Sequence, residues 1–266
     1  MSEPNLFLRT RACLQEADPD RKCACVEALF REWRAGELST ATVPVAPFGE
    51  PGRPARPQLV APRDLPRRTL TTPAGHAALI HALCHIEFNA INLALDAVYR
   101  FRELPETYYG DWLQVAKEEA YHFGLLRDHL HRLGHAYGDF SAHNGLWETA
   151  GQTADDPLLR MALVPRVLEA RGLDVTPGIR DKLRSIGDAA GDAILDIIQR
   201  DEVGHVETGS RWFRHLCEQR GLDPESTFQR LLSDHMTGTI RGPLDRQARR
   251  RAGFSEAELD YLEGAG

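Results

Sequence analysis

The chain has few cysteines, and they follow no regular arrangement. Its 5 cysteines, among 266 residues, stand at positions 13, 23, 25, 84 and 217. Small disulfide-stabilised domains carry even, closely spaced sets, so this pattern excludes such a scaffold and favours a reducing, cytoplasmic location. The Cys23-x-Cys25 spacing is typical of metal motifs, but no second pair accompanies it. We therefore expect these two cysteines to be ordinary small residues.

Long hydrophobic runs are also missing. The N-terminal MSEPNLFLRT has no apolar stretch of signal-peptide length, and the most apolar segment, 74–95, contains Glu87, three histidines and two asparagines. A membrane span rarely carries so many polar groups, so we expect no membrane association. The alternation of polar and apolar residues that is typical of β-strands is absent too. The sequence therefore predicts an all-α fold.

Charge of neither sign dominates the chain. Lysine and arginine total 32 against 39 aspartates and glutamates, which gives a formal net charge of −7. A mildly acidic protein is a poor candidate for a dedicated nucleic-acid binder. Arg246 and 249–251 form a basic run, which we interpret as a solvated face rather than an RNA contact. The 42% share of hydrophobic residues is enough for a full core.

Proline is concentrated in one segment, and this concentration divides the chain. Seven prolines and two glycines fall between Val43 and Arg68, as is typical of an extended, stiff segment. The residues before this segment have a helical pattern, which is strongest over Lys22–Leu38. We therefore predict three parts: an N-terminal helix and proline-rich strap over 1–70, a helical bundle over 71–223, and a C-terminal helical tail over 224–266.

Four long helices are predicted within the bundle, at about 73–102, 107–133, 156–172 and 188–220, with capping residues or glycines near several ends. A loop is expected over 139–153, and a short helix after Thr176-Pro177. In the tail, Ser255 and Glu258 have the spacing of a capping box and predict a small terminal helix.

The first of these helices contains one carboxylate in an apolar setting. Between Arg68 and Asp96, Glu87 is the only formally charged side chain. A helix that is apolar on nearly all sides is a central helix, and an ionised carboxylate buried there is costly unless a partner compensates it. A metal cation is one such partner, and a hydrogen bond from a neighbouring helix is the alternative.

The second and fourth helices each carry a Glu-x-x-His pair inside an apolar stripe. Glu119 and His122 interrupt the stripe of the second helix, and Glu202 and His205 interrupt that of the fourth. Positions i and i+3 share one helix face, so carboxylate and imidazole can reach the same metal ion. Chance alone gives roughly one such motif in a chain of this composition, so the placement of the two motifs carries the prediction.

The acidic positions also recur at nearly equal intervals. Glu119 follows Glu87 by 32 positions, and Glu202 follows Glu169 by 33. One such interval returns the chain to the same height in an antiparallel bundle. Di-iron and di-manganese proteins of the ferritin-like type use this order: a glutamate from each of two helices and Glu-x-x-His from the other two. The predicted metal ligands are Glu87, Glu119, His122, Glu169, Glu202 and His205. For Glu169, an exposed acid at a helix end remains the alternative.

These residues in their setting resemble the ferritin-like superfamily, and more closely a bacterial family within it that is catalogued as a domain of unknown function. The resemblance rests on PGRPARP, DLPRR, HIEFNAINLALDAVYRF, AKEEAYHFGLL, RDEVGHV and GFSEAEL. It implies an antiparallel four-helix bundle with the same six ligands. The chain is similar, more distantly, to the tRNA-(methylthio-isopentenyl-adenosine) hydroxylase family, which uses the same ligand pattern.

Four carboxylates and two imidazoles favour iron or manganese over zinc, which takes fewer ligands and often thiolates. We expect two iron ions, with manganese or a mixed pair as the open alternative. The leading hypothesis is an O₂-dependent oxidoreductase, an oxidase or hydroxylase of unknown small-molecule substrate. An electron donor and a homodimer are left open. The other hypotheses are a non-enzymatic iron-storage or metal-buffering protein and a tRNA-modifying hydroxylase, which the net acidity disfavours.

Overall fold

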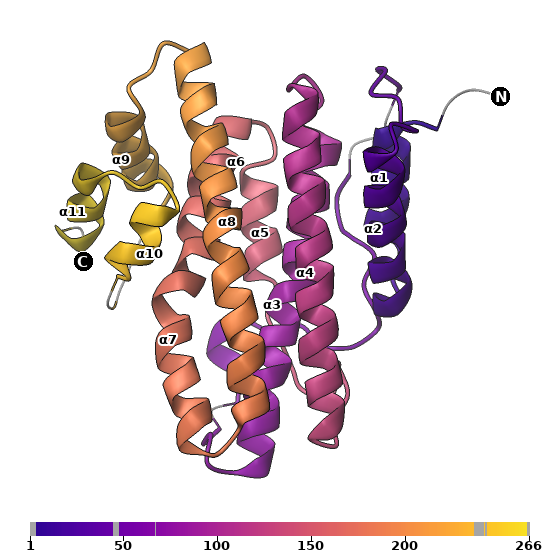
Figure 1. Cartoon of the computed structure of the whole chain (residues 1–266), viewed down its shortest axis with the longest axis vertical. Coiled ribbons are helices and arrows are strands. Elements are labelled where there is room, and N and C mark those ends of the chain that lie inside the picture. The colour runs from indigo at the N-terminus through magenta and orange to yellow at the C-terminus, as the bar shows by residue number, and fades with distance from the viewer. Residues whose placement is uncertain (1–3, 45–47, 67, 237–241, 243, 265–266) are drawn as a thin grey trace. The chain divides into compact units, whose positions relative to one another are not determined.

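The computed structural model describes residues 4–44, 48–66, 68–236, 242 and 244–264. Across these residues the secondary structure is helical, with two isolated β-bridges and no strand, so the predicted all-α fold is confirmed (Figure 1). Contacts divide the chain into two compact units, Met1–Gly151 (unit 1) and Gln152–Gly266 (unit 2). This division falls inside the bundle predicted over 71–223, and the predicted three-part organisation stays a prediction.

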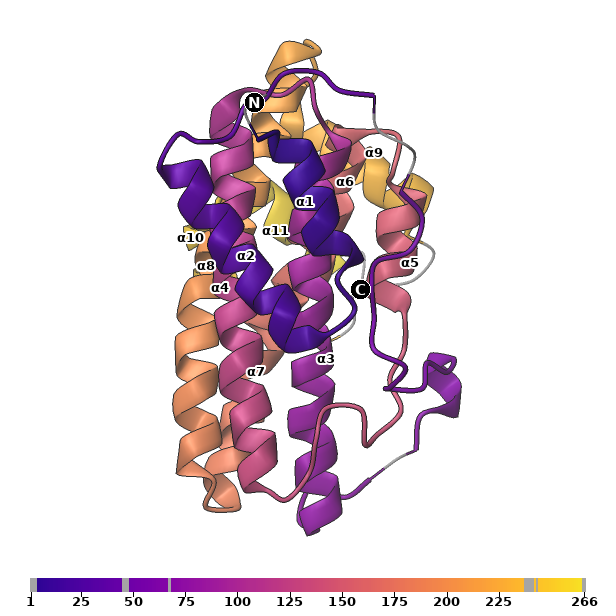
Figure 2. The ribbon, with the colours of Figure 1, turned by 90° about the vertical axis from the view of Figure 1, so that its right-hand side faces the viewer.

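Unit 1 is built around two long helices, α3 (Pro73–Arg100) and α4 (Glu106–Arg132), which pack along each other. The N-terminal helices α1 (Leu6–Gln15) and α2 (Pro19–Arg34) cover this pair, α1 against α3 and α2 against α4 (Figure 2). The predicted bounds of α3 and α4 are correct to within two residues. The helices α1, α2 and α3 each start with a polar N-cap residue. The side chains of Asn5, Asp18 and Thr72 accept hydrogen bonds from backbone N–H groups of the first turn.

The apolar character of α3 comes from its place in the core. The helix has the length and composition of a membrane span, but 72% of its most apolar window is buried inside the protein. A central helix of a water-soluble fold has the same composition, because it is surrounded by other helices rather than by lipid.

The described residues 48–66 of the proline-rich strap form no α-helix, as predicted, and contain the short 3-10 turn η1 (Pro62–Asp64). Backbone hydrogen bonds pair it with the segment after α4, since Val60 N–H donates to Ala142 O at 2.9 Å and Ala142 N–H donates to Gln58 O at 3.0 Å. That later segment was expected to be a loop, but it contains α5 (Gly145–Gln152). Burial of Trp147 against the strap, where its indole donates to Gly49 O at 3.1 Å, stabilises a helix that the local sequence does not predict.

A disulfide joins α1 to α2. Cys13 and Cys25 are bonded, with Cα atoms 5.5 Å apart, so the expectation that the Cys23-x-Cys25 pair consists only of ordinary small residues is wrong for Cys25. The two partners are 12 positions apart and lie on different helices, which is why the spacing within the motif does not reveal them. Cys23, Cys84 and Cys217 are free thiols.

In unit 2, the third predicted helix is longer than the sequence suggests. The elements α6 (Pro157–Leu163), η2 (Val164–Glu169, a π-helix) and α7 (Ala170–Ser185) follow one another without interruption. The prediction ended this helix near Gly172 and placed a separate short helix after Pro177, which instead lies inside α7. Leu173 and Leu183, on either side of Pro177, are fully buried, and their packing outweighs the hydrogen bond that the proline removes.

Pro165 accounts for the wider turn in η2. A proline in a regular α-helix has no N–H to donate, and its ring collides with the carbonyl group four residues earlier. The π-helical geometry relieves this collision. The ring of Pro165 lies against α8 (Ala189–Gln219) at Gly209, where an added Cβ would come within 2.4 Å of Pro165 Cβ. Gly209 therefore permits η2 to approach α8 closely.

We predict that Gly209→Ala destabilises the protein by about 1–3 kcal/mol, because the new methyl group overpacks the contact with Pro165. The matched control is Gly204→Ala on the same helix, where an added Cβ meets nothing within 4 Å. The control should stabilise by up to about 1 kcal/mol through helix propensity. Urea unfolding of the metal-free proteins measures both, and equal effects of the two variants would contradict the predicted overpacking.

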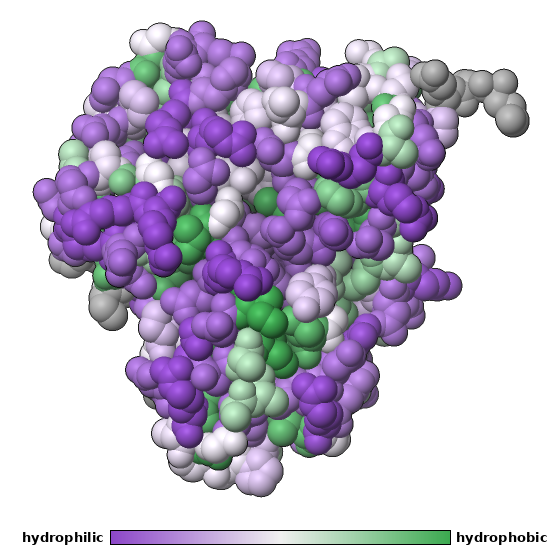
Figure 3. Space-filling model, viewed as in Figure 1, coloured by the Kyte–Doolittle hydropathy of each residue, from purple (hydrophilic) through white to green (hydrophobic). Residues whose placement is uncertain are grey.

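The tail contains α9 (Pro224–His235), α10 (Arg246–Arg251) and α11 (Glu256–Gly264). The predicted capping box is confirmed, because Ser255 N–H donates to Glu258 Oε2 at 2.9 Å and Glu258 N–H donates to Ser255 Oγ at 3.2 Å. The basic run is paired within the unit: Arg246 with Glu256, Asp260 and Glu263, Arg249 with Asp174, and Arg250 with Glu256. Hydrophilic residues cover most of the face in Figure 3.

Candidate metal centre

Unit 1 brings three of the predicted ligands together at the middle of α3 and α4. Glu87 comes from α3, and Glu119 and His122 come from consecutive turns of α4. His122 Nδ1 lies 3.4 Å from Glu87 Oε2 and 3.6 Å from Glu119 Oε2. Each of the three side chains offers a ligand atom within 4.8 Å of those of the other two. Metal ligands held by two neighbouring helices typically have this spacing.

The triad is buried, and burial controls its charge. Glu87 is 4% exposed, while Glu119 and His122 are 0% exposed. Burial raises the pKa of Glu87 well above its usual value, and the neighbouring Glu119 carboxylate raises it further. Burial alone would lower the pKa of His122, but contacts with Glu119 and Glu87 outweigh it and raise that pKa to about 11. Without a metal, a proton on His122 therefore balances one of the two acids.

These observations fit a divalent cation. When both carboxylates are ionised, the buried triad carries one excess negative charge if His122 is protonated and two if His122 is neutral. A divalent ion bound to a neutral imidazole neutralises both carboxylates, and it replaces an electrostatically strained arrangement with direct ligand bonds. Carboxylate oxygen and imidazole nitrogen are ligands suited to iron and manganese.

Unit 2 carries a similar pair on α8. His205 Nδ1 lies 3.5 Å from Glu202 Oε1, His205 is 1% exposed and the Glu202 side chain is 13% exposed. Glu169 is the last residue of η2, an element that packs against α8. Across the described residues, Glu169 does not belong to a group of three closely spaced ligand atoms. Its role as a ligand therefore stays a prediction.

Two further histidines of α3 belong to the core of unit 1 and not to the triad. His85 Nε2 donates to the carbonyl oxygen of His143 at 3.0 Å, which leaves Nδ1 to accept from the Tyr137 hydroxyl at 2.9 Å. His81 Nε2 accepts a hydrogen bond from Gly138 N–H at 2.9 Å. Burial lowers the pKa of both His81 and His85 to about 4, so both are neutral, hydrogen-bonded side chains.

Lys22 is a buried group that sequence reasoning missed. Its ammonium group is 0% exposed, donates to Asn92 Oδ1 at 2.5 Å and to Leu14 O at 3.1 Å, and lies 5.3 Å from the centre of the Phe88 ring. Burial lowers its pKa to about 7. Its partners come from α1 and α3, distant in the sequence, so no local pattern distinguishes this lysine from an exposed one.

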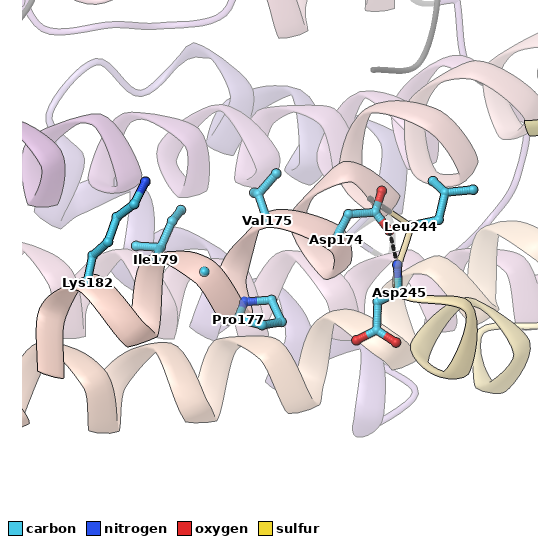
Figure 4. A pocket seen from close by; sticks show the side chains of 8 residues that line it. Asp174, Val175, Pro177, Ile179, Lys182, Leu244 and Asp245 are labelled. Carbon is cyan, nitrogen blue, oxygen red and sulfur yellow. Dashed lines mark hydrogen bonds between the residues drawn. The ribbon is translucent and has the colours of Figure 1, made fainter. Parts of the chain in front are cut away.

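A pocket of about 490 Å³ lies in unit 2, between α7 and the segment before α10 (Figure 4). Its lining includes Asp174, Pro177, Ile179 and Lys182, and none of the six predicted ligands. Asp174 is already occupied there, since its Oδ1 accepts from Asp245 N–H and its two oxygens accept from Arg249. The acid that α7 contributes to this pocket is therefore already paired within the protein.

A family model described as "Protein of unknown function (DUF455)" matches residues 15–260, which includes all of the predicted ligands. The chain belongs to the DUF455 family. A protein of Haemophilus influenzae, described as an uncharacterized protein, is 45% identical to this DUF455 chain over 265 residues, covering 96% of this chain and 92% of its own length. No solved structure matches the DUF455 chain.

Proposed function

We propose that the chain is a di-metal carboxylate protein of the ferritin-like type. It binds two iron ions, one through Glu87, Glu119 and His122 and the other through Glu169, Glu202 and His205. It acts as an O₂-dependent oxidase or hydroxylase on a small-molecule substrate. The observation that carries the proposal is the buried triad of unit 1, where two carboxylates and an imidazole converge without any other formal charge on the central part of α3.

The side chains of the protein would hold the ions and keep water away. The imidazoles of His122 and His205 would bind in their neutral form, so loading requires His122 to give up the proton that its neighbours stabilise. Phe88 and Phe123, whose ring centres are 5.5 Å apart, lie on α3 and α4 beside the ligand positions and are fully buried, which lowers the polarity of the site. Iron, when bound, supplies the electrons for O₂ chemistry.

Loading the metal-free protein anaerobically with ferrous iron and then adding O₂ tests the proposal. We expect about two iron ions per chain by elemental analysis, consumption of O₂, and an oxidised di-iron absorption band. Mössbauer spectra with magnetic coupling between the ions would show that both ligand sets serve one centre. A protein that binds no iron, or consumes no O₂ when loaded, would rule the proposal out.

Paired variants of α4 connect the result to the triad. Glu119→Gln should lower the iron content from two ions to one. Glu118→Gln, at the adjacent position, should keep both ions, because Glu118 accepts a hydrogen bond from Gln114 at 2.6 Å and is not a predicted ligand.

Iron storage or metal buffering is the second candidate function. The same buried acids would bind a divalent ion whether or not the bound ion then reacts with O₂. Iron content far above two per chain in the aerobic protein would favour storage.

The tRNA-hydroxylase hypothesis needs a surface that binds RNA. The basic run is a poor candidate for that surface, because Arg246, Arg249 and Arg250 are already paired with acids of unit 2. Salt-dependent tRNA affinity would support this hypothesis.

A further inference from the structure

Arg166 lies three residues before Glu169 on η2 and is enclosed by α8 and the C-terminal tail. It is 1% exposed. Its guanidinium carbon lies 4.7, 4.1 and 4.5 Å from the ring centres of Phe213, Phe228 and Phe254. Its Nη2 donates to Glu258 Oε2 at 2.6 Å. Three aromatic faces and one carboxylate therefore form a cage around this cation.

Stability alone does not explain a charged group in this position. Burying an arginine and a glutamate costs desolvation energy, and apolar residues of similar volume often stabilise a protein equally well or better. Among the described residues, Arg166 Nε and Nη1 have no hydrogen-bond partner, so the pairing with Glu258 is incomplete. What the cage does provide is a defined position, because the guanidinium contacts three rings and a carboxylate at the same time.

That position determines the orientation of the segment that carries Glu169. On the side facing α8, the ring of Pro165 packs against Gly209, one turn beyond His205. The adjacent residue, Arg166, is held through its cage by Phe213 of α8 and by α9, α11 and the loop before α11. The π-helical segment is thus fixed at two consecutive residues, four and three positions before Glu169.

We propose that Arg166 is a positioning residue for the metal site of unit 2. This inference rests on the proposed function. The cage formed by Phe213, Phe228, Phe254 and Glu258 fixes the π-helical segment so that the Glu169 carboxylate is presented to the ion bound by Glu202 and His205. The C-terminal tail is then part of the metal site, although it supplies no ligand.

The same tail provides a matched control. Arg249 is also fully buried and pairs with Asp174, with Nη2 donating to Asp174 Oδ2 at 2.7 Å and Nε to Oδ1 at 2.9 Å. This pair likewise joins the tail to the third helical run, but at α7, beyond the π-helical segment. Both pairs can be replaced by similar uncharged groups: Arg166→Met with Glu258→Gln, and Arg249→Met with Asp174→Asn. Neither double variant leaves a buried charge unpaired.

The experiment is a Mn²⁺ titration of the metal-free, full-length protein, followed by electron paramagnetic resonance. Each double variant is made in the wild-type and in a Glu119→Gln background, where only the ion of unit 2 should bind. We expect Arg166→Met/Glu258→Gln to weaken that ion about 10- to 100-fold, the effect typical of residues that orient metal ligands. Arg249→Met/Asp174→Asn should retain wild-type affinity. Circular dichroism and the thermal midpoint verify that both variants are folded.

The outcomes separate the two proposals. If the wild-type protein does not bind two Mn²⁺ ions, the proposed function fails before any tail variant is considered. If the wild type binds two and Arg166→Met/Glu258→Gln binds both with unchanged affinity, Arg166 does not position Glu169. If both double variants lose the ion of unit 2 equally, the tail acts only as a general scaffold, which also overturns the inference.

Discussion

Glu87→Gln is expected to stabilise the metal-free protein and, at the same time, to abolish metal binding by the triad of unit 1. The folded protein must otherwise keep an ionised Glu87 in an apolar helix or protonate it at neutral pH, since burial and Glu119 raise its pKa. Both states cost free energy, and glutamine avoids both. Glu119 and protonated His122 then remain as a balanced pair, 3.6 Å apart.

The expected gain is about 1–3 kcal/mol, comparable to that found when other buried charges are replaced. For a protein of this size it corresponds to a rise in the thermal midpoint of roughly 2–4 °C per kcal/mol. The measurement is thermal or urea unfolding in the presence of a chelator, together with Mn²⁺ binding. Glu118→Gln is the control and should change neither quantity appreciably. A Glu87→Gln protein that is less stable than wild type without metal would show that the triad is not strained.

The second large effect concerns Lys22 and pH. Burial lowers the pKa of this lysine from 10.5 to about 7 in the folded protein. The unfolded chain therefore binds more protons between these two values. The free-energy penalty of burying Lys22 is complete below about pH 7, shrinks as pH rises, and disappears above about pH 10.5. The unfolding free energy should increase with pH by up to about 1.4 kcal/mol per unit in this range.

Urea unfolding at intervals from pH 7 to pH 9 measures this slope, and the contribution of Lys22 over that range is about 2–3 kcal/mol. In Lys22→Met the contribution should vanish, and stability at pH 7 should rise, although Asn92 Oδ1 loses its donor. Lys117→Met is the matched control in unit 1: its ammonium group lies over the Phe30 ring at 4.9 Å, and its removal leaves the Lys22 slope in place. A slope that is the same in wild type and Lys22→Met would refute the prediction.

The features that the sequence predicts well are those that repeat along a single helix. Glu119 and His122 interrupt an apolar stripe of α4, and Glu87 is the only charge on the central part of α3, so local pattern alone identifies residues that the structure brings within 4.8 Å of one another. Glycines mark the end of α4 before Gly134 and the end of α8 before Gly221 in the same way, and Asp188 caps the start of α8. The start of α4, after Pro105, has no side-chain cap. The capping box of α11 is another local signal that the structure confirms.

The features that the sequence does not predict depend on distant partners. The burial of Lys22 depends on the fold, which places Asn92, 70 positions away in the chain, beside its ammonium group. In the same way, Cys25 forms a disulfide with Cys13, which lies on another helix. The helix α5 exists because Trp147 is buried against the strap. The continuous run through Gly172 and Pro177 depends on packing that offsets the poor helix propensity of these residues. For Glu169, the sequence interval suggests a ligand, while the π-helical geometry around it comes from Pro165 and its contact with Gly209.

The π-helical segment also indicates where the family can vary in length. A turn of this kind contains one residue more than an α-helical turn, so it is equivalent to an insertion of a single amino acid. Deleting one residue from 164–168 would restore a regular α-helix, and the side chains of α6 and α7 would keep nearly the same faces, because the wide turn already absorbs the extra residue. Such a deletion would instead remove the wide turn itself, and with it the close contact between Pro165 and Gly209. In an alignment of relatives, a gap within this stretch would mark members in which the third helical run has no wide turn.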